Sequence, residues 1–152
     1  MKAVEVSKLF LFWSARNGDN PITNLKLQKL LYYAQGWSFV ELKKELFEDE
    51  IEAWQYGPVV PEVYNAYKSF KNLPIEYDIE KDNSDIEENF DKETLGFLKK
   101  FYESYIVIPA FRLVESSHQE RPWLEAYNNK GPKSIIEKRV IQEFFEEWNN
   151  KE

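Results

Sequence analysis

Apolar side chains recur every three or four residues through most of this chain, which is the period of an amphipathic α-helix. The pattern predicts a first helix over residues 3–16 and a second over residues 23–42, with Thr23 as the N-cap of the second. Proline is favoured at the first position of a helix, so Pro61 predicts a third helix that ends near residue 71. The second helix is the longest of the three, and we expect it to be the central packing element.

Between residues 46 and 56 the helical period gives way to an alternation of side chains. Alternation is typical of a half-buried strand, and here it predicts a small β-hairpin near residues 46–56. Gly57 and Pro58 are expected to turn the chain at the end of this hairpin. Further along, apolar residues alternate with acids over residues 75–79, a pattern that suits an edge strand and an ordered loop equally well.

The C-terminal half predicts four more helices. They are expected over residues 91–105, with Asp91 as the cap, over 109–118, over 122–128, and from the sequence Ser-Ile-Ile-Glu at 134–137 to the C-terminus. That last sequence has the form of a capping box, in which the first and fourth side chains bond to the helix start. The predicted fold is mainly α: a single compact helical domain of about six or seven helices with a small β-hairpin.

The amino-acid composition excludes several kinds of functional site. The chain has 152 residues, enough for one domain over residues 1–152, with 25 aromatic residues, one histidine and no cysteine. A disulfide framework, a thiolate zinc site and a purely histidine-based metal site are thereby excluded, and no cofactor is expected. Since no apolar run approaches the roughly 18 residues of a membrane span, we expect a cytoplasmic protein without a membrane partner.

The charge is concentrated in one segment. The whole chain carries 20 Lys and Arg against 27 Asp and Glu, a net charge of −7, and residues 76–93 alone hold nine acids and two lysines. We expect this acidic segment to be mobile and solvated, or to steer a basic partner electrostatically. Binding to nucleic acid requires clustered basic residues, so none is expected of this chain by itself.

Three segments resemble a known family in their order and content. They are TNLKLQKLLYYAQGW at residues 23–37, EAWQYGPVVP at 52–61 and SHQERPW at 117–123. Over roughly residues 7–145 the chain is similar to the Panacea domain, the SocA-like antitoxins that include phage-associated GepA-like proteins. The motif residues that carry this resemblance are Leu27, Gln28, Leu30, Leu31, Tyr32, His118, Pro122 and Trp123.

The resemblance implies an intracellular, non-enzymatic antitoxin that neutralises a cognate protein toxin of a toxin–antitoxin system by direct contact. It also offers an alternative, because the founding member of the family is an adaptor that presents its toxin to a protease. Some relatives carry an additional DNA-binding domain, for which we expect no room in 152 residues.

The first two of these segments supply the candidate partner-contact residues. These are Lys26, Lys29, Trp54, Tyr56, Gly57 and Pro58. The lysines are expected on the polar face of the second helix, where they are solvated, face a partner or buttress the hairpin. The two aromatic side chains either pack on the second helix or form exposed anchors of the kind that dominate interfaces.

His118 invites a catalytic interpretation. Its position near a helix end favours a structural role, but Arg112 and His118 also fit the Arg-x4–6-His pattern of helical HEPN ribonucleases. A pattern of two residues arises readily by chance, so a small ribonuclease that uses this pair is kept as the alternative function. No catalytic residue is assigned.

Overall fold

The computed structural model describes residues 1–81 and 85–151. Its α-helices are α1 (Ala3–Asn17), α2 (Asn24–Glu41), α3 (Pro61–Tyr67), α4 (Lys92–Tyr105), α5 (Ala110–His118), α6 (Arg121–Lys130) and α7 (Lys138–Asn150). Two 3₁₀ turns, η1 (Lys68–Phe70) and η2 (Ile86–Asn89), and three strands, β1 (Ile51–Trp54), β2 (Gly57–Val59) and β3 (Ser134–Ile136), complete the described part. The prediction of a mainly α fold with a small β part is confirmed.

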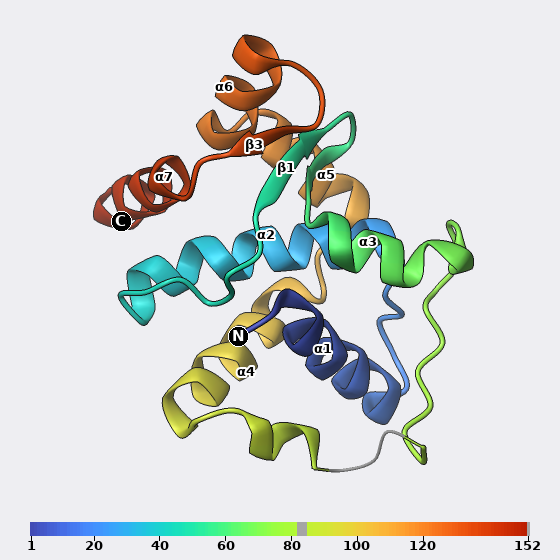
Figure 1. Cartoon of the computed structure of the whole chain (residues 1–152). Helices are drawn as coiled ribbons and strands as arrows, with labels where there is room; N and C mark the ends of the chain where they lie inside the picture. The colour runs from blue at the N-terminus through green and yellow to red at the C-terminus, as the bar shows by residue number, and fades with distance from the viewer. Residues whose placement is uncertain (82–84, 152) are drawn as a thin grey trace.

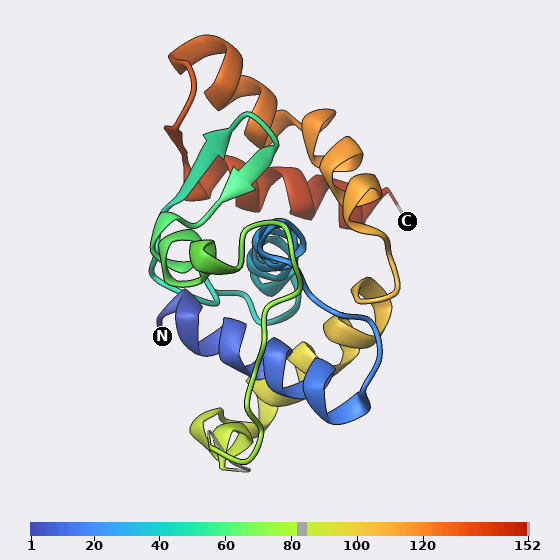
Figure 2. The same ribbon diagram turned by 90° about the vertical axis from the view of Figure 1, so that its right-hand side faces the viewer.

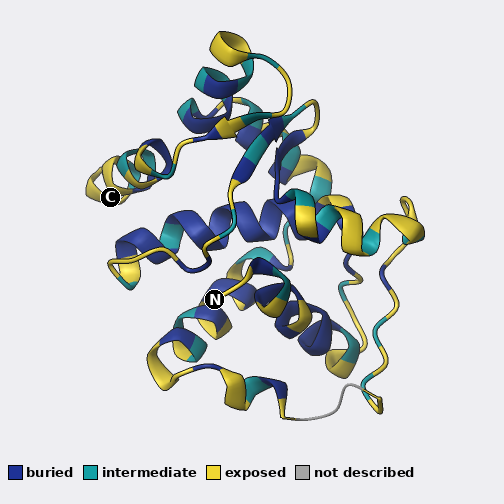
Figure 3. Cartoon of the chain, viewed as in Figure 1, coloured by how far each residue is buried: buried dark blue, intermediate teal, exposed yellow. Residues whose placement is uncertain are grey.

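Helix α2 lies at the centre of the molecule, as predicted. It contacts α1, α3, α4, α5, α7 and β2, and nearly all of it is buried (Figure 3). In two perpendicular views, α1 and α4 lie on one side of α2 while the sheet, α6 and α7 lie on the other (Figures 1 and 2). The approach of α7 depends on Gly36, since a Cβ there would lie 2.2 Å from Cε2 of Phe145.

The hairpin lies further along the chain than predicted. Strand β1 pairs with β2 and with β3, both antiparallel, in the order β2-β1-β3, and Gly57 and Pro58 belong to β2 instead of ending the hairpin. Residues 46 and 47 form no strand, because their amides donate to Oε1 of Gln35 at 2.7 and 3.2 Å. Pro58 lies in an edge strand, where its missing N–H is tolerated.

Strand β3 replaces the predicted capping box at 134–137, and that prediction is wrong. The Ser134 hydroxyl donates to the Ala126 carbonyl at 2.8 Å instead of capping a helix. Ile135 and Ile136 pair with Glu52 and Ile51 of β1, and α7 begins only at Lys138. The pairing partner lies more than 80 residues away in sequence, so no local pattern reports it.

Local capping chemistry is confirmed elsewhere. The Thr23 hydroxyl accepts from the Lys26 amide at 3.2 Å, Asp91 accepts from the Thr94 amide at 2.8 Å, and α3 begins at Pro61. Helix α3 ends at Tyr67, earlier than predicted, and continues as η1.

The acidic segment is partly anchored. Ile75 donates its amide to the Ile22 carbonyl at 2.9 Å, beside a single bridge between Thr23 and Pro74, so residues 75–79 form no regular strand. In η2, Ile86 is buried and Glu87 accepts from Nε1 of Trp13 at 2.7 Å. Mobility of the segment stays a prediction, and residues 82–84 of it lie outside the described residues.

Across residues 1–81 and 85–151, no helix combines the length and the apolar character that crossing a bilayer requires.

Candidate functional site

A large groove opens where the start of α2, the β1–β2 turn, α5 and the loop before β3 meet. Its volume is about 1050 Å³. Three large apolar side chains line it while remaining accessible to solvent: Leu25 is 41% exposed, Tyr56 62% and Phe111 63%. We call this hollow, which is lined by Leu25, Trp54, Tyr56, Phe111, Lys29, Lys71 and Lys133 among others, the hairpin groove. Contiguous exposed apolar surface of this kind marks an interaction site.

Trp54 and Tyr56 differ in how they meet the groove. The ring of Trp54 lies against Tyr64 of α3, with centroids 4.9 Å apart, and Nζ of Lys133 lies over the Trp54 ring, 4.8 Å from its centroid. Trp54 therefore forms part of the groove wall and packs on α3 instead of α2. Tyr56 sits at the hairpin turn and projects its side chain into solvent. Of the two aromatics, Tyr56 is the one placed as an exposed anchor.

The two lysines of α2 are buried, and the prediction that they lie on a solvated face is wrong. Nζ of Lys29 donates to the Pro58 carbonyl at 3.0 Å, so this lysine buttresses the hairpin, as one of the predicted alternatives has it. Lys26 donates to the Ile106 carbonyl and does not line the groove. Burial lowers the pKa of Lys29 to about 7 and also lowers the pKa of Lys26. The sequence pattern misplaced both because α2 is enclosed on nearly all sides.

Gly57 permits the close approach of the hairpin to α2. A Cβ at this position would lie 2.5 Å from Cε of Lys29 and 2.9 Å from Oγ of Ser117. Its φ of 112° also lies in the region that glycine adopts without a steric penalty. The predicted role of Gly57 and Pro58 as partner contacts is not tested, but both are buried and neither lines the groove.

Gln28 connects three elements through its side-chain amide. Its Oε1 accepts from the Val60 amide at 2.8 Å, and its Nε2 donates to Oδ1 of Asn24 at 2.8 Å. Asn24 in turn donates to the Tyr64 carbonyl at 3.1 Å. This chain of hydrogen bonds holds the end of the hairpin and α3 against α2.

His118 and Trp123 fasten the other side of the hairpin. Nε2 of His118 lies 3.0 Å from the Gln55 carbonyl oxygen, which only accepts, so this nitrogen is the donor. The His118 ring lies against Trp123, tilted by 39° with centroids 4.4 Å apart, and Nε1 of Trp123 donates to the Trp54 carbonyl at 2.8 Å. This arrangement is the structural role that the position of His118 favoured.

Arg112 takes no part in these contacts between His118, Trp123 and the hairpin. Its guanidinium lies 5.9 Å from the centroid of the Phe111 ring. His118 follows Arg112 by six positions along α5, which places the two side chains about 120° apart around the helix axis. The pair required by the ribonuclease alternative is therefore not brought to one face of α5.

The remaining motif residues lie in the core. Leu27, Leu30, Leu31 and Tyr32 are fully buried, and Pro122 is buried at the start of α6. Tyr32 and Tyr33 donate their hydroxyls to the two carboxylate oxygens of Glu120, at 2.8 and 2.7 Å. Burial raises the pKa of Glu120 to about 7. Sequence analysis missed Glu120, although two adjacent tyrosines on an apolar helix signal a need for buried acceptors.

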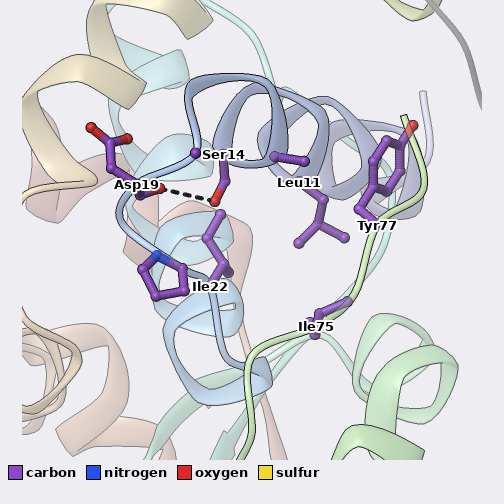
Figure 4. A pocket seen from close by; sticks show the side chains of 9 residues that line it. Leu11, Ser14, Asp19, Ile22, Ile75 and Tyr77 are labelled. Carbon is purple, nitrogen blue, oxygen red and sulfur yellow. Dashed lines mark hydrogen bonds between the residues drawn. The ribbon is translucent and has the colours of Figure 1, made fainter. Parts of the chain in front are cut away.

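A second, smaller pocket lies between α1 and the segments that follow α1 and η1. Its volume is about 280 Å³. Figure 4 shows Leu11, Ile22, Ile75 and Tyr77 among the side chains that line it. The Ser14 hydroxyl at its edge is already engaged with the Asp19 and Asn20 carbonyls at 3.4 and 3.0 Å. Among the described residues, no group of three His, Asp or Glu side chains is placed to hold a metal ion.

Comparison with known proteins assigns the family. The family described as antitoxin SocA-like, Panacea domain, matches residues 27–124, which is more than half of the chain. The chain belongs to this antitoxin family. The matched part of the Panacea domain runs from α2 through the hairpin and α5 into α6, and so includes most of the elements that form the hairpin groove. Membership supports an antitoxin role.

One curated relative is antitoxin SocA of Caulobacter vibrioides (strain NA1000 / CB15N), which is 47% identical over 51 residues. The alignment covers 34% of this chain and 27% of the relative, so the chain matches about a quarter of that protein's length. No solved structure matches the chain.

Proposed function

We propose that this protein neutralises a cognate protein toxin by binding it directly in the hairpin groove. One observation carries the proposal: Leu25, Tyr56 and Phe111 are large, apolar and exposed, and they line the same groove. Exposed aromatic side chains that are surrounded by packed structure are the usual source of binding energy at interfaces. Family membership supplies the class of partner.

The groove is well suited to inhibition by occlusion. Hydrogen bonds from Gln28, Lys29, His118 and Trp123 hold the hairpin in place before any partner arrives. A surface that is fixed in advance loses little conformational entropy on binding, which favours a tight complex. A toxin held there has its active site covered or its active shape prevented, and no chemical step by the antitoxin is required.

The test uses the reading frame adjacent to the gene. Expression of that frame alone is expected to stop growth, and co-expression of this protein is expected to restore it. Tyr56→Ala combined with Phe111→Ala should abolish the rescue, whereas Val107→Ala should not. Val107 is the matched control, because it is 65% exposed and does not line the groove. A harmless neighbour, or full rescue by the Tyr56/Phe111 variant, would contradict the proposal.

The same assay separates occlusion from delivery to a protease. In a host whose ATP-dependent proteases are deleted, an antitoxin that acts by occlusion still rescues growth. An adaptor does not, because its toxin is no longer degraded. We expect rescue to persist, together with an undiminished amount of toxin in the cell. Loss of rescue in that host would replace occlusion by the adaptor mechanism.

A further inference from the structure

The charges around the hairpin groove point to one kind of partner segment. We propose that the groove receives an amphipathic helix of the toxin whose polar face is acidic. This inference rests on the proposed function, because it assigns a chemistry to the segment that the same groove would hold. It is carried by the charge of the lining residues and by the geometry of the neighbouring edge strand.

Every charged side chain that lines the groove in the described part of the chain is a lysine. Lys71 and Lys133 are exposed, whereas the third, Lys29, is buried beneath the hairpin, so the first two supply the positive charge that a partner meets. The whole protein carries seven more acids than bases, so the groove is electropositive on a molecule of opposite net charge. Complementary charge across an interface selects the partner and fixes its orientation. An acidic segment therefore fits the groove, and a basic one is repelled.

Two helix ends add to this positive potential. The first residues of α2, Asn24 and Leu25, and the first residues of α5, Ala110 and Phe111, all line the groove. The N-terminal end of a helix carries a partial positive charge from its aligned peptide dipoles. The lysines and the two helix ends thus act in the same direction.

Lys71 and Lys133 occupy backbone positions that favour glycine. Their φ angles are 56° and 65°, in a region where a residue with a Cβ is strained. The Lys133 amide donates to the Ala53 carbonyl at 2.7 Å, and its Nζ lies 4.8 Å from the Trp54 ring centroid. Lysine at these two positions costs folding stability, as it does at Lys43 outside the groove, whose φ is 61°.

A helix fits the groove better than an added strand. Strand β2 is the edge of the sheet beside the groove, but Pro58 in its middle has no N–H to donate. The Pro58 carbonyl is already bonded to Lys29. Pairing of a partner strand to this edge is therefore blocked, whereas an amphipathic helix needs only an apolar groove for its side chains.

Aromatic rings beside lysines also suit single-stranded nucleic acid. The groove, however, is lined in addition by aliphatic side chains, among them Leu25, Val114 and Pro132, which offer no stacking face for a base. The observations therefore favour an acidic protein segment, and RNA binding becomes one outcome of the test.

The test uses labelled helical peptides as probes and the full chain as receptor. One peptide has leucine and tryptophan on one face and glutamate on the other, and its twin has lysine in place of each glutamate. A third probe is single-stranded oligouridylate. Fluorescence anisotropy is measured with the unaltered protein, with Lys71→Glu/Lys133→Glu, and with Lys99→Glu/Lys100→Glu as the control. The control pair is exposed on α4 and changes the net charge by the same amount.

We expect the acidic peptide to bind the unaltered protein at least about tenfold more tightly than its basic twin at low salt. Lys71→Glu/Lys133→Glu should reverse this preference, and Lys99→Glu/Lys100→Glu should retain it. Equal binding of both peptides, no reversal by the groove variant, or oligouridylate binding more tightly than the acidic peptide would each overturn the inference. Circular dichroism first establishes that the variants are folded.

Failure of this inference is distinguishable from failure of the proposed function. If the two peptides bind alike while the Tyr56/Phe111 variant still fails to rescue growth, the charge inference is wrong and the groove remains the toxin site. If the Tyr56/Phe111 variant rescues growth fully, the groove is not the toxin site, whatever the peptides do.

Discussion

The β-hairpin has an inner side that is bonded to the rest of the fold and an outer side that faces the groove, and the same sequence segments contribute to both. On the inner side, Gln28, Lys29, His118 and Trp123 bond to the hairpin backbone from α2, α5 and the start of α6. On the outer side, Tyr56 and its neighbours in the groove are exposed. Most of the residues that carry the family resemblance therefore build a scaffold. The side chains proposed to contact a partner are interspersed with these residues in the sequence. Substitutions can therefore change one side of the hairpin and leave the other intact.

The largest effect is expected from a scaffold carboxyl. Glu120 has its pKa raised from 4.5 to about 7 by burial, so between these pH values the folded chain holds a proton that the unfolded chain has released. The free energy of unfolding should therefore fall by about 3 kcal/mol as the pH rises from about 4.5 to about 7, at 1.36 kcal/mol per unit of pKa. Urea denaturation at a series of pH values measures this.

Glu120→Gln should remove that fall, while Glu125→Gln, at a half-exposed position of α6, should keep it. Above neutral pH the free energy of unfolding should instead rise with pH. Burial lowers the pKa of Lys29 from 10.5 to about 7, so the unfolded chain binds the extra proton and stability rises between these values. A Glu120→Gln variant with an unchanged pH profile would show that this carboxyl is not buried as described.

A second scaffold prediction concerns Gly36. Gly36→Ala places a methyl group inside the Phe145 ring and forces α2 and α7 apart, which should cost about 2–3 kcal/mol of unfolding free energy. Gly96→Ala is the control, because nothing lies within 4 Å of a Cβ at that position of α4. The control should gain about 0.5–1 kcal/mol from helix propensity. Thermal melts of the two variants should thus shift in opposite directions, and equal shifts would refute the packing described.

The smallest effect belongs to the groove and has the opposite sign. Lys71→Gly and Lys133→Gly each relieve a positive φ, so each should raise the unfolding free energy, by at most about 1 kcal/mol. Both should nevertheless weaken the binding of the acidic peptide. Lys43→Gly is the matched control, since Lys43 also has a positive φ, of 61°, and does not line the groove. Destabilisation by both groove substitutions would contradict the strain argument.

The sequence predicts what local chemistry decides. The cap at Thr23, the cap at Asp91 and the proline start at Pro61 were all predicted because each involves bonds within a few residues. Long-range contacts were not predicted. Ser134 resembles a helix cap but pairs in a strand with β1, and Lys29 reads as a solvated residue because no periodicity reveals that the hairpin covers it.

The candidate site was predicted only in part. Trp54 and Tyr56 were identified as an alternating aromatic pair, which is a local signal, and Tyr56 does line a groove as an exposed side chain. Phe111 and Lys133 were not identified, because only the fold brings α5 and the loop before β3 to the hairpin. The groove is a tertiary feature, and its charge becomes visible only when the lining residues are assembled.

The central claim is that Tyr56 acts in binding and not in folding. The most direct measurement is the affinity of Tyr56→Ala for the toxin encoded by the adjacent frame, paired with the unfolding free energy of the same variant. The account predicts a loss of about 2 kcal/mol in binding, seen mainly as faster dissociation, with stability unchanged within about 0.5 kcal/mol. Unchanged affinity, or a loss of stability as large as the loss of binding, would contradict it.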